Sequence, residues 1–182
     1  MASITFATIR RDQPYQFIRL GTFLERADNT ARLLDVRFHA AQAGGSEPAL
    51  AHEEGDGQDG DFYHWSALLH SVSAYEVYRE VYHDTVQPAR VAELLMLRAD
   101  MPRGLLACAQ GMRRILPRLS LGAPTEQALR GLEAQQLAEA LCRQLEQAHL
   151  ASILRQGLHD YLLGIMQQLD ALGHAISAAF FD

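Results

Sequence analysis

The sequence has 182 residues and a formal net charge of −6, from 16 basic and 22 acidic side chains. This length suits one domain with a substantial core. Six of the acids lie between residues 44 and 61, and subtracting them leaves 16 acids against 16 bases. The remaining chain therefore carries no basic field of the kind that binds nucleic acid.

The sequence predicts neither a signal peptide nor a membrane span. The first residues, MASITFATIRR, contain no apolar stretch typical of a signal peptide. No apolar run approaches the roughly 18 residues of a membrane span. Cys108 and Cys142 form no CxxC motif and no disulfide-rich pattern, which is typical of a reducing compartment. These features predict a cytoplasmic protein without a membrane segment.

The N-terminal third predicts one long helix between two irregular segments. Residues 1–13 are short and mixed and are expected to form an arm. A helix is expected from Pro14, which suits a first turn, to about Gln42, before the Gly44–Gly45 pair. Residues 44–61 are rich in glycine and acids and predict a mobile insertion in a single domain that spans 14–182.

The rest of the chain predicts further helices. One is expected over residues 62–83, and a short one begins at Pro88 and is ended by Pro102. Asp100 is expected to cap a fourth helix that runs to about Leu116, closed by Pro117. The last two helices are expected from Thr125 to about residue 149 and over about thirty C-terminal residues, the latter about 45 Å long. No strand signal competes, so the predicted fold is all-α, an antiparallel bundle of five to six helices with a long C-terminal helix.

The helix over residues 14–42 carries an unusual polar face. At 100° per residue its apolar side chains share one arc, and charged side chains occupy the neighbouring arc. Glu25–Asn29 and Asp28–Arg32 are i,i+4 pairs, and Arg32–Asp35 is an i,i+3 pair. One interpretation is a solvated face with ion pairs worth roughly 0.2–0.5 kcal/mol each. The other is a polar network that faces the bundle interior and recognises a ligand.

Three side chains elsewhere join the second interpretation. Tyr75 and Tyr78 need hydroxyl partners if they are buried, and we expect one of them to reach the polar face. Arg103 lies in the first turn of a predicted helix, against the dipole preference for acids there. It is therefore a candidate to hold a ligand or a tertiary carboxylate.

Other chemistry has weaker support. Glu80–His83 and Glu146–His149 have the Glu-x-x-His spacing of diiron carboxylate bundles. A fourth carboxylate helix has no candidate, so a ferritin-like metal site remains only a third alternative and no metal ligand is assigned. The remaining histidines are expected to be structural or at the surface, and both cysteines to be buried thiols. No phosphate-binding loop motif is present, and no cofactor is predicted.

The string LERADNTARLLDV, with Glu25–Arg26, resembles the signature of the bacterial alpha-E family, an all-helical family named for its Glu-Arg motif. The segments around Trp65, Tyr75 and Tyr78, from Leu94 through Arg103 to Cys108, and GLHDYL near Gly157 are also similar. The resemblance covers about Phe17 to Phe181. It implies a functional face built from Glu25, Arg26, Asp28, Asn29, Arg32 and Asp35.

The resemblance also implies a cellular role. Such proteins accompany circularly permuted ATP-grasp enzymes and transglutaminase-like proteases, so an ATP-grasp-type ligase and a transglutaminase-like protein are the expected partners. The leading hypothesis is a helical partner or accessory enzyme of an amide-forming or peptide-modifying system. Under it, Glu25, Asp28 and Asp35 bind an amine or act as base. Arg26, Arg32 and Arg103 hold a carboxylate or phosphate.

One departure from the family concerns length. Family members usually have about 300 residues with a related helix in each half, and this chain resembles the second half. We therefore expect self-association, or a partner that carries the missing half, through the first or last long helix. The alternative to the amide-forming role is a non-enzymatic protein–protein interaction module that docks through the helix at 14–42.

Overall fold

The computed structural model describes residues 13–43, 58–121 and 125–181, and these residues form eight helices and no strand. The helices are α2 (Gln13–Ala43), α3 (Gln58–Ser71), α4 (Tyr75–Tyr82), α5 (Pro88–Leu97), α6 (Leu105–Ser120), α7 (Thr125–Glu146), α8 (Leu150–Gln156) and α9 (Leu158–Phe180). The all-α prediction is confirmed. The predicted arm lies outside the described residues except for Gln13, as does the predicted insertion except for 58–61, which begin α3.

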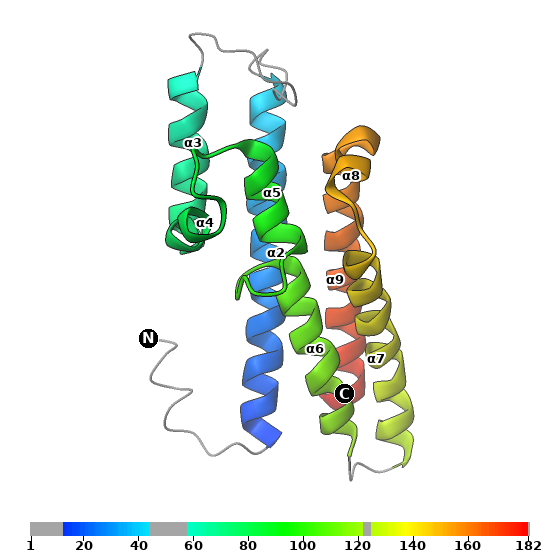
Figure 1. Cartoon of the computed structure of the whole chain (residues 1–182). Helices are drawn as coiled ribbons and strands as arrows, with labels where there is room; N and C mark the ends of the chain where they lie inside the picture. The colour runs from blue at the N-terminus through cyan, green and yellow to red at the C-terminus, as the bar shows by residue number, and fades with distance from the viewer. Residues whose placement is uncertain (1–12, 44–57, 122–124, 182) are drawn as a thin grey trace.

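Four long helices, α2, α6, α7 and α9, form an up-down-up-down bundle (Figure 1). Each packs against two neighbours, so that α2 contacts α6 and α9 while α7 contacts the other sides of the same two helices. The short step from Ser120 to Thr125 favours the antiparallel pairing of α6 and α7, whereas α3, α4 and α5 lie between α2 and α6 in the chain, and α8 lies between α7 and α9. The described part of the molecule therefore has α2 on the side of the bundle opposite to α7.

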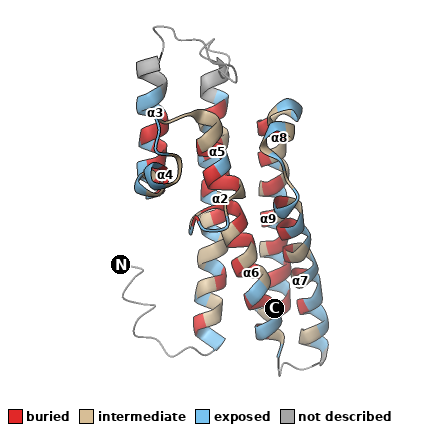
Figure 2. Ribbon diagram, viewed as in Figure 1, coloured by how far each residue is buried: buried red, intermediate tan, exposed pale blue. Residues whose placement is uncertain are grey.

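The core runs along the axis of this bundle (Figure 2). The largest fully buried side chain is Tyr78. The next largest come from the chain between α2 and α6 and are Leu20, Leu34, Leu68, Leu69, Leu94, Leu95, Met96, Met101, Leu105, Met112 and Leu116. On α2, apolar residues recur at helical spacing and face inward, as the sequence predicts. One stripe of α2 is thereby fixed against the bundle, and its polar residues are left at the flanks.

The helices α3, α4 and α5 pack beside the C-terminal half of α2 (Figure 1). Trp65 of α3 meets Phe38 of α2 edge-on, with ring centroids 4.7 Å apart. The predicted single helix at 62–83 is wrong, because Ser73 adopts a left-handed φ of 56° and the N–H of Ala74 bonds back to the carbonyl of Leu69 at 2.7 Å. This break separates α3 from α4.

Three other predicted helix details are corrected by the structure. The C-terminal helix is broken at Gly157, whose φ of 112° favours glycine, so α9 has 23 residues and α8 is separate. Helix α6 continues through Pro117 to Ser120, because Leu119 is still buried against the core. Asp100 does not cap α6, whose N-cap is Gly104, and pairs with Arg98 instead.

Within the described residues, no helix combines the length and the apolar character that crossing a bilayer requires.

Candidate functional site

The polar face of α2 lies at the surface of the bundle and not in its interior. Arg32 Nε is 2.7 Å from Asp28 Oδ2, and the two side chains are 62% and 33% exposed. The predicted Asp28–Arg32 pair is therefore present, whereas the interpretation of an interior-facing network is wrong. Asn29 is exposed on the same helix, and no hydrogen bond to another described residue involves its side chain or that of Glu25.

Four of the six predicted site residues of α2 line two grooves, whereas Asn29 and Asp35 line neither. Glu25, Asp28 and Arg32 line a groove between α2 and α9, whereas Arg26 lines a second groove between α2 and α6. This division follows from helix geometry, because adjacent residues point about 100° apart around the axis. The predicted functional face is thus two surfaces, one on each flank of α2.

We call the first surface the acidic groove. It has a volume of about 520 Å³ and is lined by Gly21, Leu24, Glu25, Asp28, Arg32, Leu169, Asp170, Gly173, His174 and Ser177. Gly21 adds no side chain to the groove, and a Cβ built at this position would meet no atom within 4 Å. The groove is open to solvent, with α2 forming one side and α9 the other.

Carboxylates outnumber cations in the acidic groove. Glu25, Asp28 and Asp170 face one guanidinium, that of Arg32. His174 Nδ1 lies 2.9 Å from the backbone oxygen of Asp170 and 3.6 Å from its carboxylate. Since Asp28 is occupied by Arg32, Glu25 and Asp170 supply the remaining negative charge. Oxygen acceptors in this number suit an ammonium or amide N–H donor.

Asp35 lies further along α2 and is engaged by the start of α9. Its Oδ1 is 2.6 Å from Nδ1 of His159, and the Asp35 side chain is 18% exposed. The hydrogen bond and charge of Asp35 raise the pKa of His159. The ring of His39 lies 5.7 Å from that of His159. This pair fixes α2 against α9 beyond the groove.

The other predicted site residues lie away from the acidic groove. The buried Tyr78 hydroxyl donates to the carbonyl of Thr85 and accepts from the N–H of Gln87, both at 2.9 Å, so it serves the α4–α5 connection and not α2. Tyr75 stacks on His70, with ring centroids 4.3 Å apart. Arg103 meets α2 through its backbone, where its carbonyl accepts from Thr30 Oγ1 at 2.9 Å.

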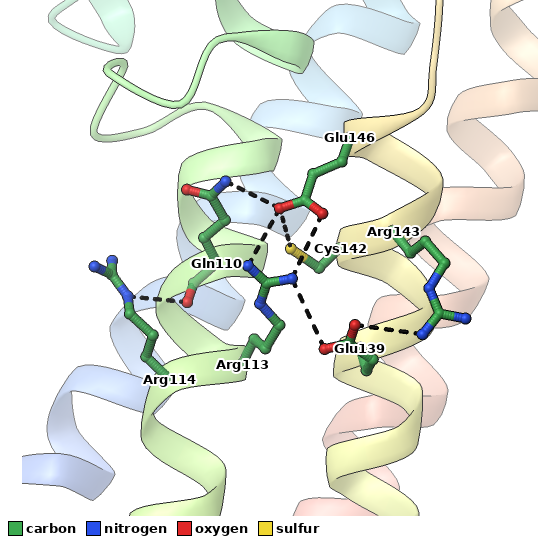
Figure 3. Close-up of polar contacts among 7 residues, drawn as sticks. All are labelled: Gln110, Arg113, Arg114, Glu139, Cys142, Arg143 and Glu146. Carbon is green, nitrogen blue, oxygen red and sulfur yellow. Dashed lines mark hydrogen bonds and ion pairs between the residues drawn. The ribbon is translucent and has the colours of Figure 1, made fainter.

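Glu146, the acid of the second Glu-x-x-His spacing, belongs to a polar cluster between α6 and α7 (Figure 3). Glu146 accepts from Gln110 Nε2 at 3.2 Å and pairs with Arg113 Nη2 at 3.2 Å. Burial raises the pKa of the neighbouring Cys142 thiol to about 11, with a further contribution from its hydrogen bond to Glu146. Among the described residues, no group of three or more His, Cys, Asp or Glu side chains could hold a metal ion.

Asp170 and His174 are site residues that sequence reasoning missed. They are four residues apart on the exposed face of α9, and with Ser177 they form a polar stripe of helical spacing. That spacing was visible in the sequence, but the amphipathic pattern alone does not say that this edge of α9 faces Glu25. As predicted, His174 is a surface residue, with 79% of its side chain exposed.

Comparison with curated proteins gives no match, and comparison with solved structures gives none either. The family model of Alpha-E, described as a predicted alpha-helical domain with a conserved ER motif, matches residues 1–181. Glu25–Arg26 is the one Glu-Arg dipeptide in the sequence, and it lies at the point of α2 where the two grooves divide. The chain therefore belongs to the Alpha-E family.

Proposed function

We propose that the protein is a helical accessory component of an amide-forming or peptide-modifying system that depends on an ATP-grasp ligase. In this proposal the acidic groove holds the amine-bearing end of a peptide-like substrate. The observation that carries it is the excess of carboxylates over cations along the groove, with Glu25 unpaired among the described residues. An ammonium group placed there donates charge-assisted hydrogen bonds to Glu25, whose carboxylate accepts none from a described side chain of the protein.

Binding suits this groove better than proton transfer. Asp28 is held by Arg32 and Asp35 by His159, so two of the three candidate carboxylates already have cationic or donor partners. The groove is also open to water, whereas general base catalysis is most effective where water is excluded. We therefore assign Glu25 to binding the amine, Asp28 and Arg32 to shaping the groove, and bond formation to the proposed ligase partner.

The binding step is tested with glycylglycinamide, which carries an ammonium group and no carboxylate, by titration calorimetry. The matched ligand is its N-acetylated form, which lacks the positive charge. We expect the amine to bind more tightly than the acetylated form. Glu25→Gln should weaken amine binding by about fivefold, since an exposed ion pair contributes up to ~1 kcal/mol. Glu133→Gln, an equal loss of charge on the exposed face of α7, is the control.

Equal affinity for the two ligands, or equal effects of the two variants, would rule out the amine site. The partner is tested separately by capture from the native cell extract and mass spectrometry. Recovery of an ATP-grasp ligase or a transglutaminase-like protein supports the proposed system. Recovery of neither, from an extract that contains both, contradicts it.

A second candidate is an interaction module without a small-molecule ligand. Leu33 and Val36 of α2 are 37% and 63% exposed, and on α9 Leu163 is 42% exposed. Apolar side chains on the outer faces of both helices favour docking of a protein or of a second copy. Val36→Lys should then abolish association, as measured by light scattering and partner capture.

A further inference from the structure

The groove between α2 and α6 is lined mainly by positive charge, in contrast to the acidic groove, and we call it the basic groove. It also has a volume of about 520 Å³, and it lies between α2, α6 and the segment that joins α5 to α6. Its lining residues are Tyr15, Arg19, Thr22, Phe23, Arg26, Ala99, Asp100, Pro102, Ala107, Gln110 and Arg114. Helices α2 and α6 pack side by side along it (Figure 1).

Three arginines supply the charge of the basic groove. Arg19 and Arg26 are seven residues apart on α2 and therefore share one flank of the helix. Arg114 comes from α6, where its Nε donates to the backbone oxygen of Gln110 at 3.2 Å. Figure 3 shows Arg114 extending from the side of α6 away from Arg113 and Glu146. None of the three guanidinium groups forms an ion pair with a described carboxylate.

The one acid in the groove lining is already neutralised. Asp100 pairs with Arg98 through two contacts, one of them 2.9 Å long between Nε and Oδ1. These contacts also lower the pKa of Asp100, so it stays ionised and paired. The groove consequently keeps an excess of positive charge. A chain with a net charge of −6 that concentrates unpaired arginines in one groove leaves them available to an anion.

Two of the three arginines, Arg19 and Arg114, are also positioned before any ligand binds. The guanidinium carbon of Arg19 lies 5.2 Å from the ring centroid of Phe23 and 5.9 Å from that of Tyr15. Cation–π contacts of this length hold the side chain along α2. Arg114 donates from Nε, and neither of its Nη groups forms a hydrogen bond or ion pair with another described residue, so both are available as donors. The groove thus presents oriented guanidinium forks from two helices.

We propose that the basic groove binds the diphosphate group of a small molecule through Arg19, Arg26 and Arg114. The rise of the helix separates the Cα atoms of Arg19 and Arg26 by about 10 Å, a span that two linked phosphoryl groups bridge better than one. Phosphoryl oxygens accept in several directions and so satisfy forks from two helices, whereas a carboxylate suits a single fork. The chain has no glycine-rich phosphate loop, so the side chains make these contacts.

The short extent of the basic groove excludes a nucleic acid strand as the ligand. A strand needs a basic track that continues over many phosphates, and outside this groove the charges of the chain are mixed. The proposal is independent of the amine site, because Arg19, Arg26 and Arg114 line a different groove from Glu25. Failure of either titration leaves the other unaffected.

The experiment is calorimetric titration of the full chain with inorganic pyrophosphate at low ionic strength. The comparison ligand is citrate, which has a negative charge similar to that of pyrophosphate but carries it on carboxylates. ADP tests whether the diphosphate belongs to a nucleotide. We expect pyrophosphate to bind more tightly than citrate. Affinity for ADP above that for pyrophosphate assigns a nucleotide, and equal affinity assigns the diphosphate alone. Each of these results supports the site.

The matched variants are Arg26→Gln, Arg114→Gln and the control Arg118→Gln, which removes the same charge from an exposed position one turn further along α6. We expect Arg26→Gln and Arg114→Gln each to weaken pyrophosphate binding by about tenfold, because charge-assisted hydrogen bonds are lost. Arg118→Gln should change it by less than about twofold. Because Arg114 is exposed, we expect its replacement to preserve the fold, and circular dichroism of the variant checks this. No pyrophosphate binding, citrate binding of equal strength, or equal effects of Arg114→Gln and Arg118→Gln would overturn the proposal.

Discussion

Glu25 and Arg26 are adjacent in the chain, but their side chains line different grooves. Glu25 lies in the acidic groove between α2 and α9, and Arg26 lies in the basic groove between α2 and α6. The angle of about 100° between successive helical residues produces this separation. The Glu-Arg dipeptide therefore places opposite charges on the two flanks of one helix, each available to a different ligand.

Reversal of the charge at Glu25 should leave the fold intact. Glu25 is exposed and has no partner among the described side chains, so Glu25→Lys should change the free energy of unfolding by less than about 0.5 kcal/mol. Urea unfolding followed by circular dichroism measures this change. A loss of stability above about 2 kcal/mol would show that Glu25 is structural, and would remove the argument for a ligand.

Two glycines in the helices should respond to alanine in opposite ways. Gly21→Ala should stabilise the protein by about 0.5–1 kcal/mol, because its Cβ meets no atom within 4 Å and alanine favours helix. At Gly111 a Cβ would lie 2.6 Å from the Phe23 ring, so Gly111→Ala should destabilise by about 1–2 kcal/mol through overpacking. Thermal unfolding of both variants checks the pair. Equal shifts in Tm would contradict the close packing of α2 on α6.

The His159–Asp35 contact should stabilise the protein more at low pH. The pKa of His159 is raised by its hydrogen bond to Asp35 and by the charge of that carboxylate. A raised folded-state pKa contributes stability that is fully present below the unfolded value of about 6.5 and is lost as the pH rises through the folded value. Asp35→Asn should thus be more destabilising at acidic than at alkaline pH in urea unfolding. An equal loss of unfolding free energy at acidic and at alkaline pH would show that the protonated imidazole of His159 contributes nothing to stability.

Removal of the Tyr78 hydroxyl should be costly. That hydroxyl bridges the carbonyl of Thr85 and the N–H of Gln87 inside the α4–α5 connection. Tyr78→Phe leaves both backbone groups without this partner and should destabilise by about 1–3 kcal/mol. Tyr82→Phe is the control, since its hydroxyl bonds only to the exposed Glu93 carboxylate. If the two variants unfold at the same urea concentration, the bridge does not stabilise the connection.

Periodicity in the sequence predicted most of the fold, and its failures have local causes. The bounds of α2 were predicted to within one residue at each end because Pro14 and the Gly44–Gly45 pair mark them. The break at Ser73 was missed because no glycine or proline marks it. The break at Gly157 was missed because the apolar pattern continues across it, from Leu154 to Leu158.

Less of the candidate site than of the fold could be predicted from the sequence. Charges on α2 could be placed on an arc, but two adjacent interhelical grooves cannot be distinguished until α6 and α9 are in position. The sequence carries no signal for Arg19, which falls between apolar residues, or for Arg114, which only the packing of α6 brings to α2. The pattern of one segment predicts which of its residues share a face of the helix, but not which other helices that face meets.

The order of the helices along the chain has a consequence for synthesis. The basic groove needs residues up to Arg114, whereas the acidic groove needs α9 as far as Ser177, which is 63 residues later. At roughly 5–20 residues per second, a ribosome takes several seconds to cover that interval. A nascent chain therefore has the elements of its arginine-lined groove well before α9 arrives to form the second side of the groove that contains Glu25. Ends of α2 and α9 then meet through Phe17 and Phe180, whose rings lie 5.3 Å apart, and the acidic groove is the last of the two to be completed.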